Sequence, residues 1–193
     1  ETYGHILEGS FTETDLLKPR NPYSASKAGA EMMVNAFHET YGIPTLITRS
    51  SNNYGPYQFP EKVIPLFVTN LLRGKKVPLY GEGKQIRDWI YVEDHCAGIE
   101  LVLRKGKMGE IYNIAGEHEI TNLELTQTIL HEMGFGNEMI QKVSDRLGHD
   151  FRYSLNSDKL KELGFKINHP FQERLRSTIQ WYKENEWWWK PLA

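Results

Sequence analysis

The sequence predicts an α/β fold, because segments with helical periodicity alternate with short apolar segments that have strand character. The clearest case is an amphipathic helix over residues 24–41, followed after a two-residue turn by an apolar strand over 44–49. A helix, a tight turn and an apolar strand form a βαβ-type step, which places this stretch in an α/β layer.

Local signals support each predicted element in turn. Pro22 suits the first turn of the helix over 24–41, and Gly42 is typical of the residue that follows a helix. Residues 52–60 are rich in turn formers and are predicted to be a loop, and Asn122 is a plausible N-cap. Further helices are predicted over 63–73, 93–104, 122–133, 157–163 and 171–185, and further strands over 77–80, 85–92 and 110–114.

The composition excludes several classes of protein. Among the 193 residues, 39% are hydrophobic and 25% charged, which is ordinary for a globular protein, and the net charge of −2 indicates no nucleic-acid partner. No apolar run approaches the ~20 residues that a membrane span requires. Cys96, the single cysteine, permits no internal disulfide; we predict that it is a small buried residue in a cytoplasmic protein.

Two further features have simple interpretations. The seven histidines are not paired with cysteine or with each other at the spacing of metal ligands, so no metal site is predicted. The run Trp187-Trp188-Trp189 could anchor a membrane interface. Since no basic amphipathic helix accompanies it, we favour a C-terminal packing patch and expect no membrane partner.

Tyr23 and Lys27 form the strongest chemical motif. At the start of a helix, residues four apart lie on the same face. A nearby ammonium group lowers the pKa of a phenol, so that a tyrosine can act as a general base near neutral pH. Tyr80 and Lys84 have the same spacing, but the glycines between them indicate a turn. The spacing alone also fits an exposed tyrosine beside a solvated lysine.

Longer motifs favour the functional interpretation. Five segments are informative: Asn-Pro-Tyr-Ser-Ala-Ser-Lys over 21–27, Arg-Ser-Ser-Asn-Asn-Tyr-Gly-Pro over 49–56, Phe-Pro-Glu-Lys-Val-Ile-Pro over 59–65, Gln-Ile-Arg-Asp-Trp-Ile-Tyr-Val-Glu-Asp-His over 85–95, and Asp-Arg-Leu-Gly-His-Asp-Phe-Arg-Tyr over 145–153. In these segments the sequence resembles the extended short-chain dehydrogenase/reductase family, and within it the dTDP-glucose 4,6-dehydratases.

The resemblance refines the predicted α/β fold and its division into domains. It implies that residues 1–55 are the C-terminal part of a Rossmann-type parallel sheet that binds NAD. Residues 56–193 would mainly form a smaller, mixed α/β domain for the nucleotide sugar, with about 93–115 returning to the Rossmann layer. In this family the helix equivalent to 24–41 joins a partner helix, which implies a homodimer.

The resemblance also implies a reaction. In this family bound NAD oxidises C4 of dTDP-glucose, water is lost across C5 and C6, and the hydride returns to C6. Tyr23 matches the base at the 4-hydroxyl, Lys27 its partner and Glu1 the base at C5. The Thr-Asp pair that precedes this Glu in the family, and the glycine-rich phosphate loop, are absent from these residues. We therefore expect that the chain starts within a domain and is inactive alone.

Binding residues follow from the same matches. Tyr23, Lys27 and Asn53 are expected to contact NAD. The expected substrate-binding residues are Asn52, Lys62, Val63, Pro78, Tyr80, Arg87, Asn122, Arg146 and His149. Simpler roles compete with these, because paired asparagines often form turns and Lys62 or Arg87 could be solvated surface charges.

Alternative functions remain open at this point. A nucleotide-sugar 4-epimerase or a UDP-glucuronate decarboxylase of the same family would share most of these motifs. An epimerase returns the hydride to C4 and needs no base at C5, so the role of Glu1 discriminates between an epimerase and a dehydratase. A module that binds the nucleotide sugar without chemistry is the third possibility.

Overall fold

The structure is a computed structural model that describes residues 1–145, 148 and 150–192. The predicted substrate contacts Arg146 and His149 lie outside the described residues. The helices are α1 (Pro22–Tyr41), α2 (Val63–Leu72), α3 (Val92–Lys105), α4 (Asn122–Met133), α5 (Asp158–Glu162), α6 (Phe171–Glu184) and α7 (Glu186–Trp189), with 3-10 turns η1 (Asn137–Met139) and η2 (Lys190–Leu192). The strands are β1 (Ile47–Ser50), β2 (Asn52–Tyr54), β3 (Val77–Tyr80), β4 (Ile86–Tyr91), β5 (Ile111–Ile114), β6 (Glu119–Thr121) and β7 (Ile140–Val143).

The strands of the described residues form three small sheets. β1 pairs with β5, β2 with β4, and β3 with β7, all in parallel, whereas β6 pairs with β4 in the antiparallel direction. Long crossovers that contain helices connect the parallel partners, as parallel pairing requires. The predicted α/β class is therefore confirmed.

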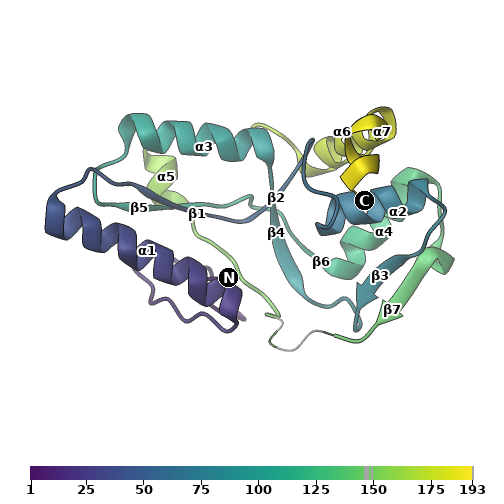
Figure 1. The fold of residues 1–193 in the computed structure, drawn as a ribbon, viewed down its shortest axis with the longest axis horizontal. Coiled ribbons are helices and arrows are strands. Elements are labelled where there is room, and N and C mark those ends of the chain that lie inside the picture. Colours follow the sequence, from purple (N-terminus) through teal and green to yellow (C-terminus); the bar gives the residue numbers. More distant parts are fainter. Residues whose placement is uncertain (146–147, 149, 193) are drawn as a thin grey trace.

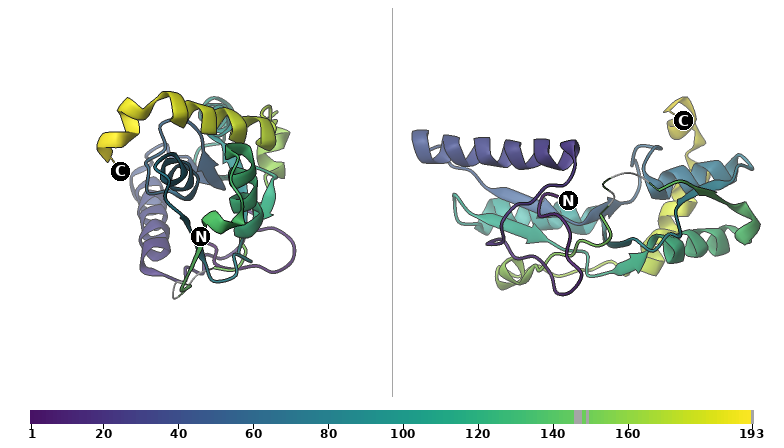
Figure 2. Two further views of the ribbon diagram at one scale, coloured as in Figure 1. Left: turned by 90° about the vertical axis from the view of Figure 1, so that its right-hand side faces the viewer. Right: turned by 90° about the horizontal axis from the view of Figure 1, so that it is seen from below.

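Two hydrophobic cores divide the molecule. One lies where α3 and α5 pack on β1 and β5, and includes Val102, Ile114 and Leu160. The larger one lies among α2, α4, α6 and β3, and includes Ile64 and Leu175. Figure 1 shows these groups of elements as two lobes, with β2 and β4 running between them. Figure 2 shows α1 and α5 on opposite sides of the β1–β5 pair.

Local signals determine the ends of α1. The Asn21 side chain accepts a hydrogen bond from the Ser24 N–H at 2.8 Å, and Ser24 Oγ accepts one from the Asn21 N–H at 3.3 Å, which forms a capping box. Pro22 occupies the first turn, and Gly42 ends the helix with φ +65°, in the left-handed region that favours glycine. The predictions for Pro22 and Gly42 are confirmed.

Several local predictions were wrong. The segment predicted to be a loop over 52–60 begins with strand β2, while β6 and β7 were not predicted. Thr121, and not Asn122, is the N-cap of α4, because Thr121 forms a capping box with Glu124 and Asn122 is the first helical residue. Cys96 is exposed on α3, although a buried position was predicted. The buried residues of α3 are Asp94, Gly98 and Val102.

The C-terminal tryptophans pack against the protein. Trp189 is fully buried and its Nε1–H donates to the Tyr182 carbonyl oxygen at 2.7 Å. Trp188 lies 5.5 Å from Trp181 between ring centroids, while Trp187 is exposed. The packing patch is confirmed for two of the three residues. Within the described part of the chain, no helix is long and apolar enough to cross a membrane.

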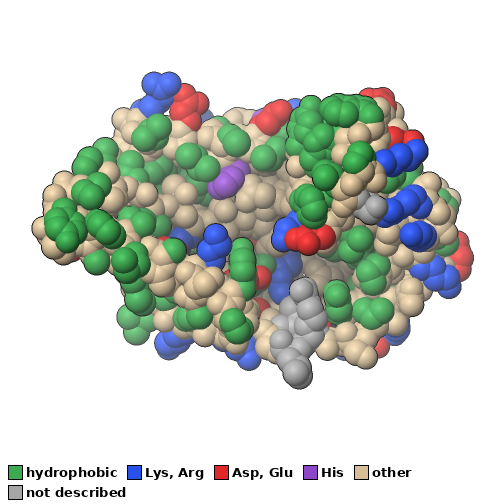
Figure 3. Space-filling model, viewed as in Figure 1, with side chains coloured by type: hydrophobic (Ala, Val, Ile, Leu, Met, Phe, Trp, Pro, Cys, Tyr) green, Lys and Arg blue, Asp and Glu red, His purple; other side chains and the backbone are tan. Residues whose placement is uncertain are grey.

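The outer face of α1 exposes large apolar side chains. Figure 3 shows hydrophobic side chains spread over the left end of the molecule, where α1 lies. The exposed apolar residues of this helix are Tyr23, Met32, Met33, Phe37 and Tyr41. Exposed apolar surface of this extent usually marks a contact with another protein surface.

Candidate active site

Tyr23 and Lys27 lie side by side in the first two turns of α1. The Lys27 Nζ atom is 6.0 Å from the centroid of the Tyr23 ring, and both side chains are exposed. The capping box at Asn21 and Ser24 fixes the direction in which this turn begins. The structure therefore places the two residues on one accessible helical face, as the spacing predicted.

Glu1 lies near the same end of the molecule. Figures 1 and 2 place the N-terminus beside the first turns of α1. The segment that follows Glu1 is hydrogen-bonded to the chain after β7, because the Ile6 N–H donates to the Arg152 carbonyl oxygen at 3.1 Å. The residues expected to be catalytic are thus gathered at the start of α1, next to the chain segment that follows β7.

Tyr153 connects two residues of the predicted substrate site. Its hydroxyl group donates to Asn52 Oδ1 at 2.6 Å, and the Arg87 guanidinium lies 4.5 Å from its ring centroid. Burial raises the pKa of Tyr153 to about 12, so the phenol is protonated at neutral pH and acts as a hydrogen-bond donor. Sequence reasoning included Tyr153 in a motif but assigned it no role.

Arg87 is more buried than a surface phosphate ligand would be. Its side chain donates to the carbonyl oxygens of Ile86 at 2.6 Å, Phe151 at 3.2 Å and Asp150 at 2.7 Å. Only 7% of the residue is exposed. The guanidinium thereby joins β4 to the segment over 150–153, and a solvated surface role for Arg87 is excluded.

Asn53 has an acceptor atom that is available for a ligand. Its Nδ2 donates to Ser50 Oγ and to the Ser51 carbonyl oxygen, both at 3.3 Å. Its Oδ1 is buried and has no hydrogen-bond partner among the described residues. Buried polar atoms are normally paired, so an unpaired carbonyl oxygen indicates a missing donor.

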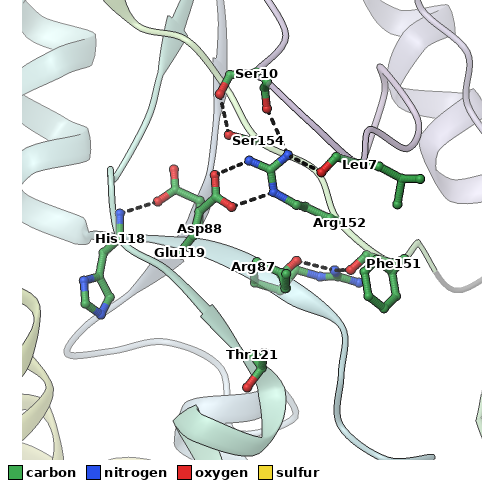
Figure 4. A network of polar contacts seen from close by, with 12 residues as sticks. Leu7, Ser10, Arg87, Asp88, His118, Glu119, Thr121, Phe151, Arg152 and Ser154 are labelled. Carbon is green, nitrogen blue, oxygen red and sulfur yellow. Dashed lines mark hydrogen bonds and ion pairs between the residues drawn. The ribbon is translucent and has the colours of Figure 1, made fainter.

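Asp88 fixes the backbone next to Asn52 and Asn53. Its carboxylate accepts hydrogen bonds from the N–H groups of Gly116 at 2.8 Å and His118 at 2.7 Å, and from the Ser51 hydroxyl. Figure 4 shows Asp88 directed at the His118 backbone. Because Ser51 directly precedes Asn52, this buried carboxylate positions β2 relative to β4.

Arg152 provides a second connection nearby. Its guanidinium pairs with both carboxylate oxygens of Glu119 at 2.7 and 2.8 Å, and donates to the carbonyl oxygens of Leu7 at 3.3 Å and Gly9 at 2.9 Å (Figure 4). Burial acts to raise the pKa of Glu119, but the hydrogen bonds from Arg152 and Ser154 outweigh it and lower that pKa. Arg152 thereby joins the N-terminal loop to β6.

The other predicted substrate residues lie in the second lobe. Lys62 is exposed, with its Nζ 3.1 Å from Glu61 Oε1, and Val63 begins α2. Pro78 and Tyr80 are half-buried on one face of β3, since residues two apart in a strand point to the same side. Asn122 begins α4, which packs on β3. These residues lie on β3 or at the start of helices that pack on it.

The arrangement combines an exposed phenol–ammonium pair, a nearby carboxylate and a polar cluster between two lobes. Such a set can remove a proton from a hydroxyl group and bind a polar, phosphorylated ligand across both lobes. Sequence reasoning missed Tyr153, Asp88 and Arg152. Their only signal was their presence in the long motifs, because their roles depend on partners far away in the chain.

Comparison with known proteins gives the family. The model of the family described as GDP-mannose 4,6 dehydratase matches residues 1–178. A dTDP-glucose 4,6-dehydratase of Streptomyces niveus is 49% identical over 193 residues, which is 100% of this chain and 57% of that protein. The low-salt glycan biosynthesis protein Agl12 of Haloferax volcanii is 48% identical over 182 residues, 94% of this chain and 59% of that protein.

Solved structures show the same similarity. The crystal structure of DesIV, a dTDP-glucose 4,6-dehydratase from Streptomyces venezuelae with NAD and TYD bound, matches with a TM-score of 0.98 and 52% identity, covering 100% of this chain and 60% of that one. A UDP-glucose 4-epimerase of Thermus thermophilus in complex with NAD matches with a TM-score of 0.89 and 30% identity, covering 95% of this chain and 61% of that one. The chain thus spans less than two thirds of the length of these relatives.

Proposed function

Since this chain belongs to the GDP-mannose 4,6 dehydratase family, we propose that the whole protein converts dTDP-glucose to dTDP-4-keto-6-deoxyglucose as an NAD-dependent lyase. The observation that carries this proposal is the exposed pair of Tyr23 and Lys27 on one face of α1. The identity of 49% to a dTDP-glucose 4,6-dehydratase along the entire chain supports this substrate and reaction.

The residues present fit NAD. Lys27 offers an exposed ammonium group that can donate to a ribose hydroxyl, and Asn53 offers a buried Oδ1 without a partner among the described residues. An amide N–H of the nicotinamide is a donor of the kind that this oxygen lacks. When bound, NAD accepts a hydride from C4 of the sugar and returns it to C6.

Each proposed catalytic residue has a defined task. The Tyr23 oxygen takes the proton of the sugar 4-hydroxyl as a general base, and Lys27 on the same helical face is its partner. The resulting C4 ketone acidifies the C5 hydrogen, which Glu1 removes as a proton. The hydroxyl group on C6 then leaves as water, with a proton from an acid that the family carries just before the Glu1 position.

We propose that the substrate lies across both lobes. Asn52 and Arg87, joined through Tyr153, would contact the sugar and the pyrophosphate. To bind a phosphate oxygen directly, Arg87 would exchange one of its three carbonyl partners for it. The proposed contacts in the second lobe are Lys62, Val63, Pro78, Tyr80 and Asn122, with Arg146 and His149 outside the described residues.

This proposal includes a division of labour along the chain. Residues 1–55, with about 93–115, would belong to the NAD-binding Rossmann layer, and the rest mainly to the nucleotide-sugar domain. The two hydrophobic cores support this division, except that Leu160 and Phe165 pack in the core of the Rossmann layer. We also propose that the 193-residue chain is inactive alone, because it spans only 57% of the length of the dTDP-glucose 4,6-dehydratase that it matches. We further propose that α1 forms a homodimer through its exposed apolar face.

The decisive experiment uses the full-length protein with dTDP-glucose. An alkali-sensitive 4-keto product is expected, and its absence would contradict the proposal. Tyr23→Phe removes the proton acceptor but keeps the ring, so turnover should fall by about 10²–10⁴-fold while dTDP binding changes little. Full turnover by this variant would show that Tyr23 is not the base.

A 4-epimerase is the second candidate, because the Thermus thermophilus enzyme matches with a TM-score of 0.89. Product analysis separates the two reactions, since an epimerase yields a dTDP-hexose that keeps its C6 hydroxyl.

For the isolated 193-residue chain, calorimetry with dTDP tests whether the chain is a module that binds the nucleotide without chemistry. Binding without turnover is the result that we expect for this chain.

A further inference from the structure

A buried ion pair joins α1 to the sheet. Arg49 of β1 donates through Nε to Glu31 Oε2 at 2.8 Å, and its Nη2 lies 2.6 Å from the same oxygen. The side chains are only 8% and 15% exposed. Glu31 lies in the middle of α1, so this pair connects the helix that carries Tyr23 directly to the strand that leads to Asn52.

The second partner of Arg49 belongs to the segment that follows Glu1. Arg49 Nη1 donates to the Tyr3 hydroxyl at 2.5 Å, and that hydroxyl donates to Asn113 Oδ1 at 2.9 Å. Burial raises the pKa of Tyr3, so its hydroxyl remains a donor. Tyr3 also stacks on Phe11 at 4.9 Å between centroids, which fixes its ring.

Helical geometry transmits the position of Glu31 to the proposed catalytic pair. Tyr23, Lys27 and Glu31 are spaced four residues apart, and four residues turn an α-helix by about 40° beyond one full turn. The three side chains therefore form one row along α1. A contact that fixes Glu31 against β1 fixes the rotation of this row about the helix axis.

We propose that Arg49, Glu31 and Tyr3 are positioning residues that hold Tyr23, Lys27 and Glu1 in register for the reaction. The inference rests on the proposed function. A buried ion pair adds little stability compared with apolar packing, but a planar guanidinium group strictly fixes the directions of the hydrogen bonds that it donates. Here the fork binds one carboxylate on the helix and one phenol two residues from Glu1, and so orients both parts of the site with one group.

The test uses the full-length enzyme and Glu31→Gln, which keeps the size of the side chain and removes its charge. We expect kcat to fall by about ten- to a hundredfold, because small displacements of reacting groups have effects of this size. KM for dTDP-glucose should stay within about twofold, since no substrate contact is lost.

A second variant and a second readout guard against misfolding. Tyr3→Phe keeps the stacking on Phe11 and removes one partner of Arg49, and should lower kcat in the same direction. Amide hydrogen exchange in residues 22–31 should become faster in both variants, which is a readout independent of turnover. Glu100→Gln is the matched control, because it removes an exposed pair with Arg104 whose side chains are 61% and 71% exposed.

The outcomes are distinct. A wild-type enzyme without turnover would overturn the proposed function and this inference with it. An active wild type together with a Glu31→Gln enzyme of unchanged kcat and unchanged amide hydrogen exchange would overturn the inference alone. If Glu100→Gln lowered kcat as much as Glu31→Gln, loss of any ion pair would explain the effect and the positioning role would be refuted.

Discussion

Asp88→Asn tests whether one buried carboxylate organises the centre of the molecule. Asp88 is 3% exposed and its two oxygens accept from Gly116 at 2.8 Å, from His118 at 2.7 Å and from the Ser51 hydroxyl. Asparagine has the same size but only one acceptor oxygen. Whichever way the amide turns, one backbone N–H group then faces an NH₂ group.

The expected loss of stability follows from these contacts. A buried N–H group without an acceptor costs about 1–3 kcal/mol, and the remaining bonds lose the added strength of a charged acceptor. The Gly116 N–H also donates a weaker hydrogen bond to Ser51 Oγ at 3.2 Å. This bond reduces the loss if the NH₂ group of the new asparagine faces Gly116. We therefore expect Asp88→Asn to lower the free energy of unfolding by ~2–4 kcal/mol.

Equilibrium unfolding in urea, followed by tryptophan fluorescence, measures this difference. Asp158→Asn is the matched control, since its side chain is 70% exposed and such surface changes stay within about 0.5 kcal/mol. If Asp88→Asn were as stable as the control, the carboxylate would not be organising Ser51, Gly116 and His118, and the reasoning would be refuted.

Two further predictions concern packing and pH. Gly116→Ala should lower the free energy of unfolding by about 3 kcal/mol or more, because the new Cβ would lie 2.0 Å from the Trp89 carbonyl oxygen; Gly29→Ala, whose Cβ meets open space on α1, should raise it by ~0.5–1 kcal/mol. Equal urea midpoints for these variants would contradict this. Burial raises the pKa of Tyr153 from 10.0 to about 12, so the unfolded chain loses this proton first and stability should fall between those pH values by up to ~2.7 kcal/mol. Tyr153→Phe should remove this part of the fall in the free energy of unfolding at alkaline pH. If the free energy of unfolding fell equally steeply with pH in the variant and the wild type, the buried Tyr153 would not be the cause of that fall.

The sequence predicted the elements whose signals are local. The start of α1 depends on Asn21, Pro22 and Ser24, and its end depends on Gly42, so neighbouring residues contain the necessary information. The pairing of Tyr23 with Lys27 is equally local, because four residues make slightly more than one helical turn. The long motifs then indicated the family, which the comparisons confirmed.

Three of the short strands were not predictable in this way. β2, β6 and β7 have only three or four residues each, and each is defined by a partner strand distant in the sequence. Nothing within Glu119–Thr121 distinguishes a strand from a loop until Ile86, Arg87 and Asp88 of β4 lie beside it. The hydrogen-bond partners of a short strand come from tertiary structure, so local propensity is a weak guide.

The sequence by itself determined that Tyr23 and Lys27 could supply a base and its ammonium partner, because these are chemical properties of the side chains and of their spacing along a helix. The expected nucleotide contacts came from the resemblance to the family. Only the tertiary structure decided how they are held. Arg49 reaches Glu31 across 18 positions and Tyr3 across 46, while Tyr153 reaches Asn52 across 101. Contacts across such separations form only when the two cores pack, so the physical reason for the division is the range of the interactions involved.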